Sequence, residues 1–498
     1  MEYIKHITIS LLLSFASYVC TAQELFHPSE PSPKHEVRAV WLTTLWGLDW
    51  PKTKATNATT MEKQKKELTQ TLDKLKECGI NTVILQTRVR GSVIYPSKIE
   101  PWDEALTGQF DRSPGYDPLA FAIDEAHKRG MQLHAWIVTV PCFKINVAKR
   151  MGKKGLLHTH PTLMKKLLDT YYLDPGLPGT AEYVSSICAE IASGYDIDGI
   201  HFDYIRYPEY KEPFPDNATY KKYGGKRPKD EWRRDNITRI AAMAYKTVKA
   251  IKPWIRMSCA PVGKYRDLKR FSAYGWDAYA AVHQDPQKWL RDGIMDMLFP
   301  MMYFRGNHFF PFAANWQEES CGRTVVPGLG IYLLSPKEGD WDWEVIQREL
   351  CFIRQQKLQG QAYFRSEFLT DNHKGVMDYL HKSYYPYPAL IPPMTWQDAV
   401  PPSAPEITES RRIDGVTYSV KWKPQEVENG GCTYAVYCSK TLPVDTSDPK
   451  NLICVTHDTS YSYSLLAATL MELHFCVTAI DRCGNESEPT AFGQRDTQ

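Results

Sequence analysis

The sequence predicts an α/β protein, a (β/α)8 TIM barrel followed by a small all-β sandwich. Three observations predict this organisation. Short apolar runs alternate with helical patterns over residues 36–383, a proline-rich segment follows, and the pattern then changes to short alternating strands. The length of 498 residues suits one large barrel plus a module of roughly 100 residues.

Eight short apolar runs are typical of parallel strands that are covered on both faces. They span residues 37–43, 82–86, 132–138, 199–202, 256–259, 297–302, 325–331 and 361–364. Helical spacing appears between them, for example at 61–78, 119–129, 181–193, 231–251 and 343–356. Strand and helix in eightfold alternation predict a closed barrel. A doubly wound sheet is the alternative, but no GxGxxG motif follows the first run.

Residues 384–405 are predicted to form a linker, because seven prolines there favour extended backbone over helix. Beyond it, runs at 417–422, 433–439, 460–463 and 473–480 have the spacing of a β-sandwich over residues 406–498. Trp422, the strand YAVYCS and the closing VTAIDRCGNESEP resemble a fibronectin type III module. These strands carry no evident row of exposed aromatic residues, so we expect a spacer or docking element.

The first 22 residues are predicted to be a signal peptide. Lys5 precedes an apolar run at 7–19 that is too short to remain in a bilayer, and Ala22 offers a cleavage point. We therefore expect an exported protein, in the periplasm or on the outer surface. Cys20 as a lipoprotein cysteine is the alternative. No later apolar run is long enough for a transmembrane segment in the mature chain.

The charge and cysteine content of the chain limit the kinds of partner that we expect the protein to bind. Lys+Arg 60 against Asp+Glu 58 gives a net charge of +2, which disfavours nucleic acid. The 12 cysteines contain no CxxC pair, which argues against a zinc site or a disulfide framework, although the five from Cys432 to Cys483 could hold one bridge. We expect a monomer without a cofactor.

The segment YDIDGIHFDYIRYP, residues 195–208, is the most informative part of the chain. Asp203 ends the fourth predicted strand, and barrels carry catalytic groups at the C-terminal ends of their strands. Alternation places His201 on the same side, deeper in the barrel, while Arg206 and Tyr207 follow and could orient the carboxylate. The alternative is that Asp203 has only a structural role, in which it caps the loop or pairs with Arg206.

EVRAVWLTT, YDIDGIHFDYIRYP, and MDMLFPMMYF with PGLGIY after it resemble the glycosyl-hydrolase-like family ten. The resemblance covers about residues 36–383 and the trailing module. It implies a barrel hydrolase of bacterial envelope glycans, with peptide-free peptidoglycan strands as one substrate. Many family members carry a second acid directly after the first, whereas this chain has Tyr204.

Glycoside hydrolysis normally needs two carboxyl groups. Glu367, just past the eighth predicted strand, is the first choice as partner of Asp203, followed by Asp285 and Asp174. Each has a structural alternative. Asp174 and Asp285 precede prolines and could start helices, and Glu367 could be a solvated loop residue.

Aromatic, arginine and glutamine side chains at strand ends could bind sugar by stacking and by forked hydrogen bonds. The candidates for substrate binding are Trp46, Gln86, Arg88, Arg90, Tyr95, Trp102, Asp174, His201, Arg206, Tyr207, Tyr303 and Tyr332. Half of the rings could instead belong to the core, and Trp136, within the third strand, is assigned to the core.

Two other functions stay open at this point. A non-catalytic glycan-binding protein would explain the lack of an obvious second acid. A metal-dependent polysaccharide deacetylase could use His158 and His160, although such a motif is expected after the first strand and lies here after the third. No metal site is therefore predicted.

Overall fold

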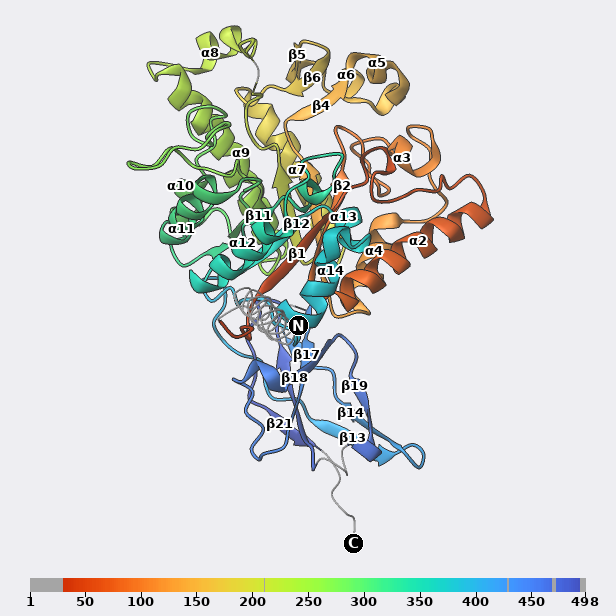
Figure 1. Ribbon diagram of the computed structural model, residues 1–498. Coiled ribbons are helices and arrows are strands. Elements are labelled where there is room, and N and C mark those ends of the chain that lie inside the picture. The colour runs from red at the N-terminus through yellow and green to blue at the C-terminus, as the bar shows by residue number, and fades with distance from the viewer. Residues whose placement is uncertain (1–29, 210, 428–429, 468–471, 493–498) are drawn as a thin grey trace, which may run out of the picture.

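The computed structural model describes residues 30–209, 211–427, 430–467 and 472–492. The expected signal peptide and Cys20 lie outside the described residues. Figure 1 shows a large α/β body above a smaller all-β body. No helix among the described residues is long and apolar enough to cross a membrane.

A ring of parallel strands forms the centre of the large body. The strands are β1 (Val37–Leu42), β2 (Thr82–Arg88), β3 (Gln132–Val138), β7 (Gly199–Asp203), β8 (Arg256–Cys259), β9 (Met297–Leu298), β10 (Thr324–Val325), β11 (Gly328–Leu329) and β12 (Gly360–Phe364). β10 pairs with β9, β11 pairs with β12, and β12 pairs with β1. Since β10 and β11 are two halves of one strand, the ring closes with eight strands. The predicted (β/α)8 barrel is confirmed, because a doubly wound sheet would leave two open edges.

The seventh strand departs most from its prediction. The run expected at 325–331 is divided at Val326 and Pro327. Pro327 has no N–H to donate to the ladder, which accounts for the break. Its carbonyl still accepts from Ala362 N at 3.0 Å, so the chain remains bonded across the gap.

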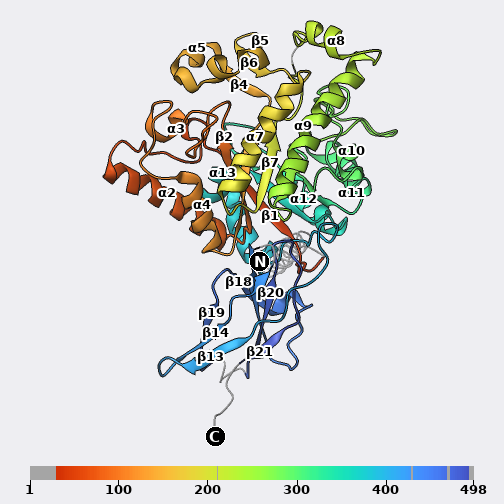
Figure 2. The ribbon, with the colours of Figure 1, turned by 180° about the vertical axis from the view of Figure 1, so that it is seen from behind.

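Helices cover the outside of the ring (Figures 1 and 2). They are α2 (Ala58–Glu77), α4 (Pro118–His127), α7 (Pro178–Gly194), α9 (Lys229–Ile251), α10 (Pro286–Arg291), α11 (Phe310–Glu318), α12 (Trp343–Gln355), α13 (Ser366–Thr370) and α14 (Val376–Tyr379). In α2, Leu68, Leu72 and Leu75 are buried as their spacing predicted, and Asn57 caps the first turn. All the helical stretches predicted from spacing are present.

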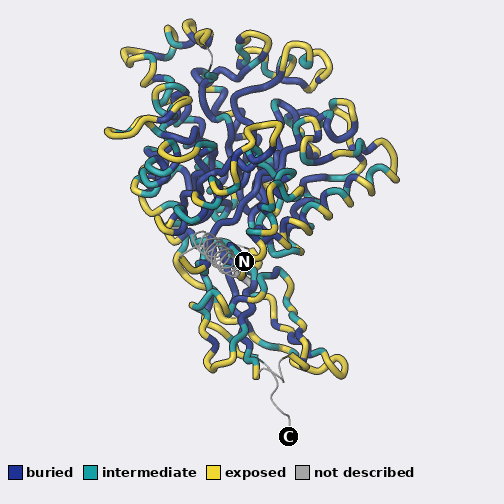
Figure 3. Tube along the Cα trace, in the orientation of Figure 1, coloured by how far each residue is buried: buried dark blue, intermediate teal, exposed yellow. Residues whose placement is uncertain are grey.

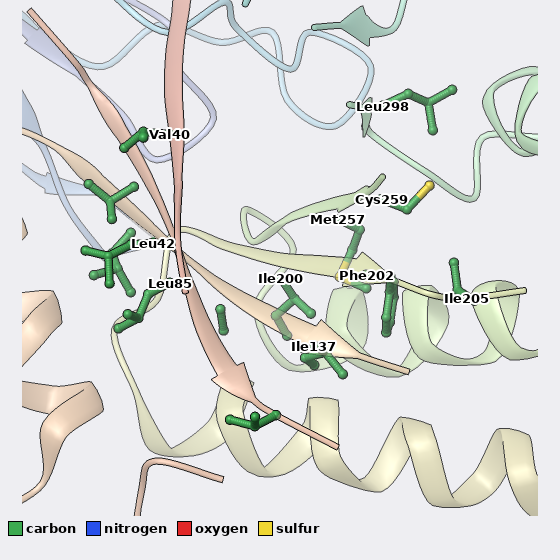
Figure 4. Close-up of a cluster of buried hydrophobic side chains, with 14 of the residues drawn as sticks. Val40, Leu42, Leu85, Ile137, Ile200, Phe202, Ile205, Met257, Cys259 and Leu298 are labelled. Atoms are coloured by element: carbon green, nitrogen blue, oxygen red, sulfur yellow. The ribbon is translucent and has the colours of Figure 1, made fainter. Parts of the chain in front are cut away.

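Side-chain alternation divides the core into two layers. Val40, Leu42, Ile200 and Phe202 point outward into the cluster between strands and helices that Figure 4 shows. Trp41 and the other inward side chains fill the barrel interior. The barrel is therefore a packed core, closed below the mouth.

Long excursions follow the second, third and fourth strands on the C-terminal side of the barrel. They contain α3 (Glu104–Thr107), then β4 (Pro141–Lys144), α5 (Ile145–Ala148), α6 (Leu156–Thr159), β5 (Met164–Leu167) and β6 (Thr170–Leu173), and finally α8 (Asn217–Tyr223). Strands β4, β6 and β5 form a small antiparallel sheet. Figure 1 shows these elements together at the end of the molecule opposite the small body, where they build one side of the mouth.

The small body contains two antiparallel sheets, as the predicted sandwich requires. One is β13 (Ile407–Arg412), β14 (Thr417–Trp422) and β19 (Ser460–Ser464). The other is β18 (Leu452–Thr456), β17 (Thr433–Ser439), β20 (His474–Ile480) and β21 (Thr490–Phe492), and a two-residue pair, β15 (Glu426–Val427) and β16 (Gly430–Gly431), lies apart. The specific likeness to fibronectin type III stays a prediction.

This module packs against the N-terminal face of the barrel, opposite the mouth (Figure 2). Arg482 pairs with Asp196 at 2.8 Å and with Asp198 at 3.2 Å, just before β7. The rings of His127 and His457 stack at 4.4 Å. Leu390, from the proline-rich segment, packs into the core of the module. Buried residues therefore continue from one body into the other (Figure 3).

The cysteines are unbonded throughout the described part of the chain. Cys78, Cys188 and Cys259 are buried and Cys351 is partly buried. The bridge that the late cysteines could have held is absent there.

Candidate active site at the barrel mouth

Asp203 ends β7 and points into the top of the barrel. Its Oδ2 accepts a hydrogen bond from Trp136 Nε1–H at 3.2 Å, and its Oδ1 accepts one from the backbone N–H of Tyr204 at 2.7 Å. Its residue is 6% exposed. Trp136 was assigned to the core. It is buried there, and it also fixes the orientation of this carboxyl.

Burial raises the pKa of Asp203 to about 6. The positive charges of Arg206 and Arg90 and the two hydrogen bonds oppose the rise without cancelling it. A carboxyl that keeps its proton close to neutral pH can donate that proton to a leaving group. Asp203 is therefore suited to general acid chemistry.

His201 lies one layer below Asp203, on the side that alternation predicted. Its Nε2 accepts from Trp41 Nε1–H at 3.1 Å, and its Nδ1 lies 2.9 Å from Ser258 Oγ. Burial lowers the pKa of His201 well below its usual value, so the ring is neutral and Nδ1–H donates to Ser258. Because the ring is fully buried, His201 supports the floor of the site and is closed to a ligand, contrary to its expected role in substrate binding.

A polar cavity of about 170 Å³, here called the mouth cavity, lies beside the turn that follows Asp203. Its lining residues are Arg90, Pro141, Lys144, Asp169, Thr170, Tyr172, Tyr204, Arg206, Tyr207, Pro208 and Glu209. Arg206 pairs with Glu209 at 3.1 Å, and Lys144 pairs with Asp169 at 3.0 Å. Three of the predicted residues, Arg90, Arg206 and Tyr207, thus line one cavity, and the charges of both arginines act on the pKa of Asp203.

A second, more apolar pocket of about 80 Å³ adjoins the first. It shares Arg90 and Lys144 with the mouth cavity and is also lined by Trp46 and Phe143. Trp46 is 69% exposed, so its ring face is open to a ligand. The expectation for Trp46 is consistent with this position.

Aromatic rings line the opposite side of the mouth. Tyr303 packs on Phe364 at 5.5 Å and on Tyr332 at 5.7 Å. Burial, together with the charge of Asp203, raises the pKa of Tyr303, which places Tyr303 near the carboxyl. Both tyrosines are partly exposed, as a sugar-binding role requires.

Three exposed aromatic residues in the loop after β8 were not predicted. Phe271, Tyr274 and Trp276 are 42%, 54% and 51% exposed. With Trp46, they make up the exposed Trp, Tyr and Phe side chains of the described chain, and all four follow barrel strands. The sequence shows these residues as an aromatic cluster between two strands, and the fold places that cluster in the loop at the C-terminal end of β8.

Several predicted binding residues are committed to contacts within the protein. Gln86 accepts hydrogen bonds from Thr43, Thr44 and Leu45 and shapes the first loop. Arg88 forms a buried ion pair with Glu100 at 2.7 Å. The expectation that Gln86 and Arg88 contact sugar is therefore wrong, because neither side chain reaches solvent.

Tyr95, Trp102 and Tyr207 also pack inward. Tyr95 donates to Glu190 at 2.9 Å, and Trp102 packs against the main core. Tyr207 contributes a wall of the mouth cavity, but it is 1% exposed. For Tyr95 and Tyr207 the expected direct contact with substrate is therefore corrected to a supporting role.

The three acids proposed as partners of Asp203 lie in different settings. Glu367 pairs with Arg365 at 2.7 Å and with Lys52 at 3.4 Å. Asp285 caps α10 by accepting from Lys288 N, as its structural alternative anticipated. Asp174 is fully buried and accepts from Thr219 Oγ1 at 2.5 Å, so it is closed to substrate as well.

Glu209 is one of two acids of the mouth cavity, with Asp169, that sequence reasoning missed. Its carboxylate lines the mouth cavity and is held by Arg206. It lies six positions after Asp203, in a loop where no periodic pattern marks it. Only the fold of that loop shows that it faces the same cavity.

His158 and His160 lie at α6, and the ring of His160 packs against Tyr183 at 4.8 Å. Within the described ranges, no group of three or more His, Cys, Asp or Glu side chains is arranged to hold a metal ion.

Comparison with known proteins identifies the family. Residues 36–329 match the family described as Glycosyl hydrolase-like 10. The match covers the barrel from before β1 to β11, which is more than half of the chain. The chain belongs to the glycosyl hydrolase-like 10 family.

Curated relatives of this glycosyl hydrolase-like 10 protein are themselves named glycosyl hydrolases. Glycosyl hydrolase YngK of Bacillus subtilis strain 168 is 30% identical over 481 residues, which is 91% of this chain and 92% of YngK. Glycosyl hydrolase DigH of Escherichia coli K12 is 32% identical over 371 residues, 67% of this chain and 84% of DigH. Among solved structures, the glycoside hydrolase domain of PgaB (BpsB) from Bordetella bronchiseptica aligns with a TM-score of 0.47 and 15% identity, over 70% of this chain and 98% of that domain.

Tyr204 occupies the position after Asp203 in this glycosyl hydrolase-like 10 protein. Its backbone has a φ of 51°, a left-handed value unusual for a tyrosine. The ring lies 4.4 Å from the Arg206 guanidinium. The turn thus places an aromatic wall and an arginine beside the carboxyl, in place of a second adjacent acid.

Proposed function

We propose that the protein hydrolyses a glycosidic bond in a bacterial envelope glycan, with Asp203 as the essential proton donor. The observation that carries this proposal is a buried carboxyl at the end of the fourth barrel strand whose pKa is raised to about 6. The exposed rings on loops that follow barrel strands, among them Trp46 in the apolar pocket, support a sugar ligand, because flat aromatic faces suit the apolar faces of sugar rings. Membership of a glycosyl hydrolase-like family supports the same reaction class.

In this mechanism Asp203 donates its proton to the leaving-group oxygen as the glycosidic bond breaks. Trp136 and the Tyr204 N–H hold the carboxyl in one orientation. Both hydrogen bonds strengthen as the carboxylate forms, so they stabilise the charge that develops.

The second carboxyl is proposed to be Glu209. Glu367, the first choice from sequence, lines neither of the two pockets described at the mouth, whereas Glu209 lines the mouth cavity. Its Oε1 lies 3.1 Å from Arg206 Nη2, which holds the carboxyl in place. Glu209 would take the proton of an attacking water or attack the anomeric carbon itself, and the anomeric configuration of the product distinguishes the two.

The proposed substrate is the peptide-free glycan strand of peptidoglycan, and the proposed location is the periplasm or outer surface. The location rests on the apolar run at residues 7–19. Fractionation of cells that make the full chain tests it, and recovery in the cytoplasm with an unprocessed N-terminus would contradict it.

The deciding experiment incubates the wild-type protein, Asp203→Asn and the control Asp235→Asn with peptide-free strands. Asp235 is an exposed residue of α9 that pairs with Arg227 and lines neither of the two mouth pockets. Mass spectrometry should find defined saccharides from the wild type and the control alone. Products from Asp203→Asn at the wild-type rate would remove the basis of the mechanism, and strand binding without any products would favour a glycan-binding protein.

A further inference from the structure

The two long excursions beside the mouth cavity carry an excess of positive charge. They are residues 139–177, after β3, and residues 204–228, after β7. Together they contain thirteen Lys and Arg against five Asp and Glu, which gives a net charge of +8. The whole chain has a net charge of only +2, so the rest of the chain is net negative. The near balance of the overall composition therefore conceals a strongly basic region.

The two excursions form one continuous end of the molecule. The rings of Tyr172 and Phe214 lie 6.2 Å apart, and Thr219 of α8 donates to Asp174 at 2.5 Å. Two opposite views show both excursions at the end that lies away from the C-terminal module (Figures 1 and 2). The module, residues 406–498, has eight Lys and Arg against thirteen Asp and Glu, a net charge of −5. A molecule with a basic end and an acidic end turns its basic end toward an anionic surface.

Six exposed lysines of the excursions form no ion pair within the described ranges. The tips on which they lie are open to solvent (Figure 3). These lysines, here called the basic rim, are Lys149, Lys153, Lys166, Lys221, Lys222 and Lys226. The other basic residues of the first excursion are paired with acids, Lys144 with Asp169, Arg150 with Glu104, Lys154 with Asp111 and Lys165 with Asp174.

Two exposed aliphatic side chains lie among these lysines. Ile145 is 38% exposed and Leu168 is 51% exposed. The backbone N–H of Ile145 donates to the carbonyl of Asp169 at 2.8 Å, so the two residues lie on neighbouring segments. An aliphatic side chain has no flat face for a sugar ring and cannot bind a phosphate, but it can enter the boundary between lipid headgroups and acyl chains. Exposed aliphatic residues among lysines are typical of surfaces that bind anionic membranes.

We propose that the basic rim, together with Ile145 and Leu168, docks the protein on an anionic lipid surface. The lysines bind the headgroup phosphates, and the two aliphatic side chains enter the headgroup boundary. Lys144 and Asp169, which adjoin these aliphatic residues, also line the mouth cavity, so docking holds the mouth beside the lipid. The proposal goes beyond the proposed hydrolysis and does not depend on it, because the docking residues lie outside the catalytic machinery.

Vesicle sedimentation with the purified protein tests the docking. The vesicles consist of phosphatidylcholine alone or of phosphatidylcholine with about 30 mol% phosphatidylglycerol. The protein should bind the anionic vesicles at least about tenfold more tightly than the neutral ones. About 1 M NaCl should remove most of this binding, because it shortens the screening length to about 3 Å.

A triple variant tests the lysines of the first excursion. It should bind the anionic vesicles at least about tenfold more weakly, and it consists of Lys149→Gln, Lys153→Gln and Lys166→Gln. The matched control removes the same charge from exposed, unpaired lysines of α2 and the module and should keep the wild-type affinity; it consists of Lys66→Gln, Lys440→Gln and Lys450→Gln.

A second variant tests the aliphatic contribution. Ile145→Thr combined with Leu168→Asn should weaken binding to anionic vesicles by about 3- to 10-fold. Asparagine suits the left-handed backbone of Leu168, whose φ is 52°. The same variant should bind the soluble polyanion heparin as the wild type does. The matched control is Ile413→Thr combined with Leu466→Asn, which changes exposed aliphatic residues of the module and should leave vesicle binding unchanged.

Three outcomes would overturn the proposal. The first is no binding to anionic vesicles at low salt. The second is an equal loss of binding in the two triple variants, because total charge would then matter and this surface would not. The third is heparin binding that depends on the three lysines without any vesicle binding, which would assign the basic rim to a soluble polyanion. Hydrolysis is measured separately on soluble saccharides, so its failure would leave the docking surface intact.

Discussion

Replacing Asp203 with asparagine should stabilise the protein while abolishing its activity. Ionised Asp203 is unfavourable in the folded state, because burial raises its pKa from 3.8 to about 6. Two pKa units correspond to about 3 kcal/mol at 1.36 kcal/mol each. A neutral amide avoids this cost at neutral and alkaline pH.

The asparagine side chain does not recover the whole of this free energy. Both carboxyl oxygens accept hydrogen bonds, from Trp136 Nε1–H and from the Tyr204 N–H. The NH2 of asparagine must face one of these donors, which costs about 1 kcal/mol or somewhat more. The net expectation is a gain of about 1–2 kcal/mol at pH 8.

The gain should depend on pH in a defined direction. A raised folded pKa means that the folded state holds the proton more tightly, so the wild type loses stability as pH rises from 3.8 through about 6. Below pH 3.8 the carboxyl is protonated in both states, and the advantage of asparagine disappears. Only the hydrogen-bond loss remains there, so the variant should then be slightly less stable than the wild type.

Urea unfolding at pH 4 and pH 8, followed by tryptophan fluorescence, measures both quantities. Asp235→Asn serves as the control, because an exposed carboxylate should change stability by less than about 0.5 kcal/mol at either pH. An Asp203→Asn variant that is less stable than the wild type at pH 8 would refute the claim that burial dominates this carboxyl. So would a gain of equal size at both pH values.

Four further results are expected. Glu209→Gln should lower kcat by at least about 100-fold, whereas Glu367→Gln should stay within about threefold, and the reverse order would restore Glu367 as the second carboxyl. In a pH profile of the wild type, kcat should fall above about pH 6 as Asp203 loses its proton, and a flat profile to pH 8 would contradict its role as acid. Trp46→Ala should raise KM by about 3- to 10-fold with kcat nearly unchanged, and an unaltered KM would remove Trp46 from the binding surface. Arg482→Gln should destabilise the protein by about 1–3 kcal/mol without changing kcat, which thermal unfolding and a rate assay check together.

The expected effect of Arg482→Gln concerns the role of the C-terminal module. A module that acts only as a spacer would not stabilise the barrel, whereas Arg482 of this module binds Asp198 at the base of β7. We therefore expect a chain without residues 406–498 to keep its hydrolysis of small soluble substrates and to unfold at a lower temperature. Loss of activity in a folded truncation would contradict the separation of the module from the mouth.

The sequence by itself determined the eight strands, the closed barrel and the position of Asp203. These depend on local periodicity, which is written in neighbouring residues. An apolar run that must be covered on both faces predicts an inner strand, and a period of two places His201 and Asp203 on the same inward face. The break in the seventh strand has a local cause too, the missing N–H of Pro327, although the apolar run at 325–331 predicted a continuous strand.

Only the tertiary structure decided which polar side chains at the strand ends reach the substrate. Arg88 and Arg90 look equivalent in the sequence, yet Arg88 is buried against Glu100 and Arg90 lines two cavities. Long loops without periodicity make this difference, because their fold buries the side chain of Arg88 and leaves that of Arg90 lining the two cavities. Arg482 and Asp198, 284 residues apart, meet for the same reason. Ion pairs and cavities depend on where distant segments come together, and no spacing in the chain encodes that.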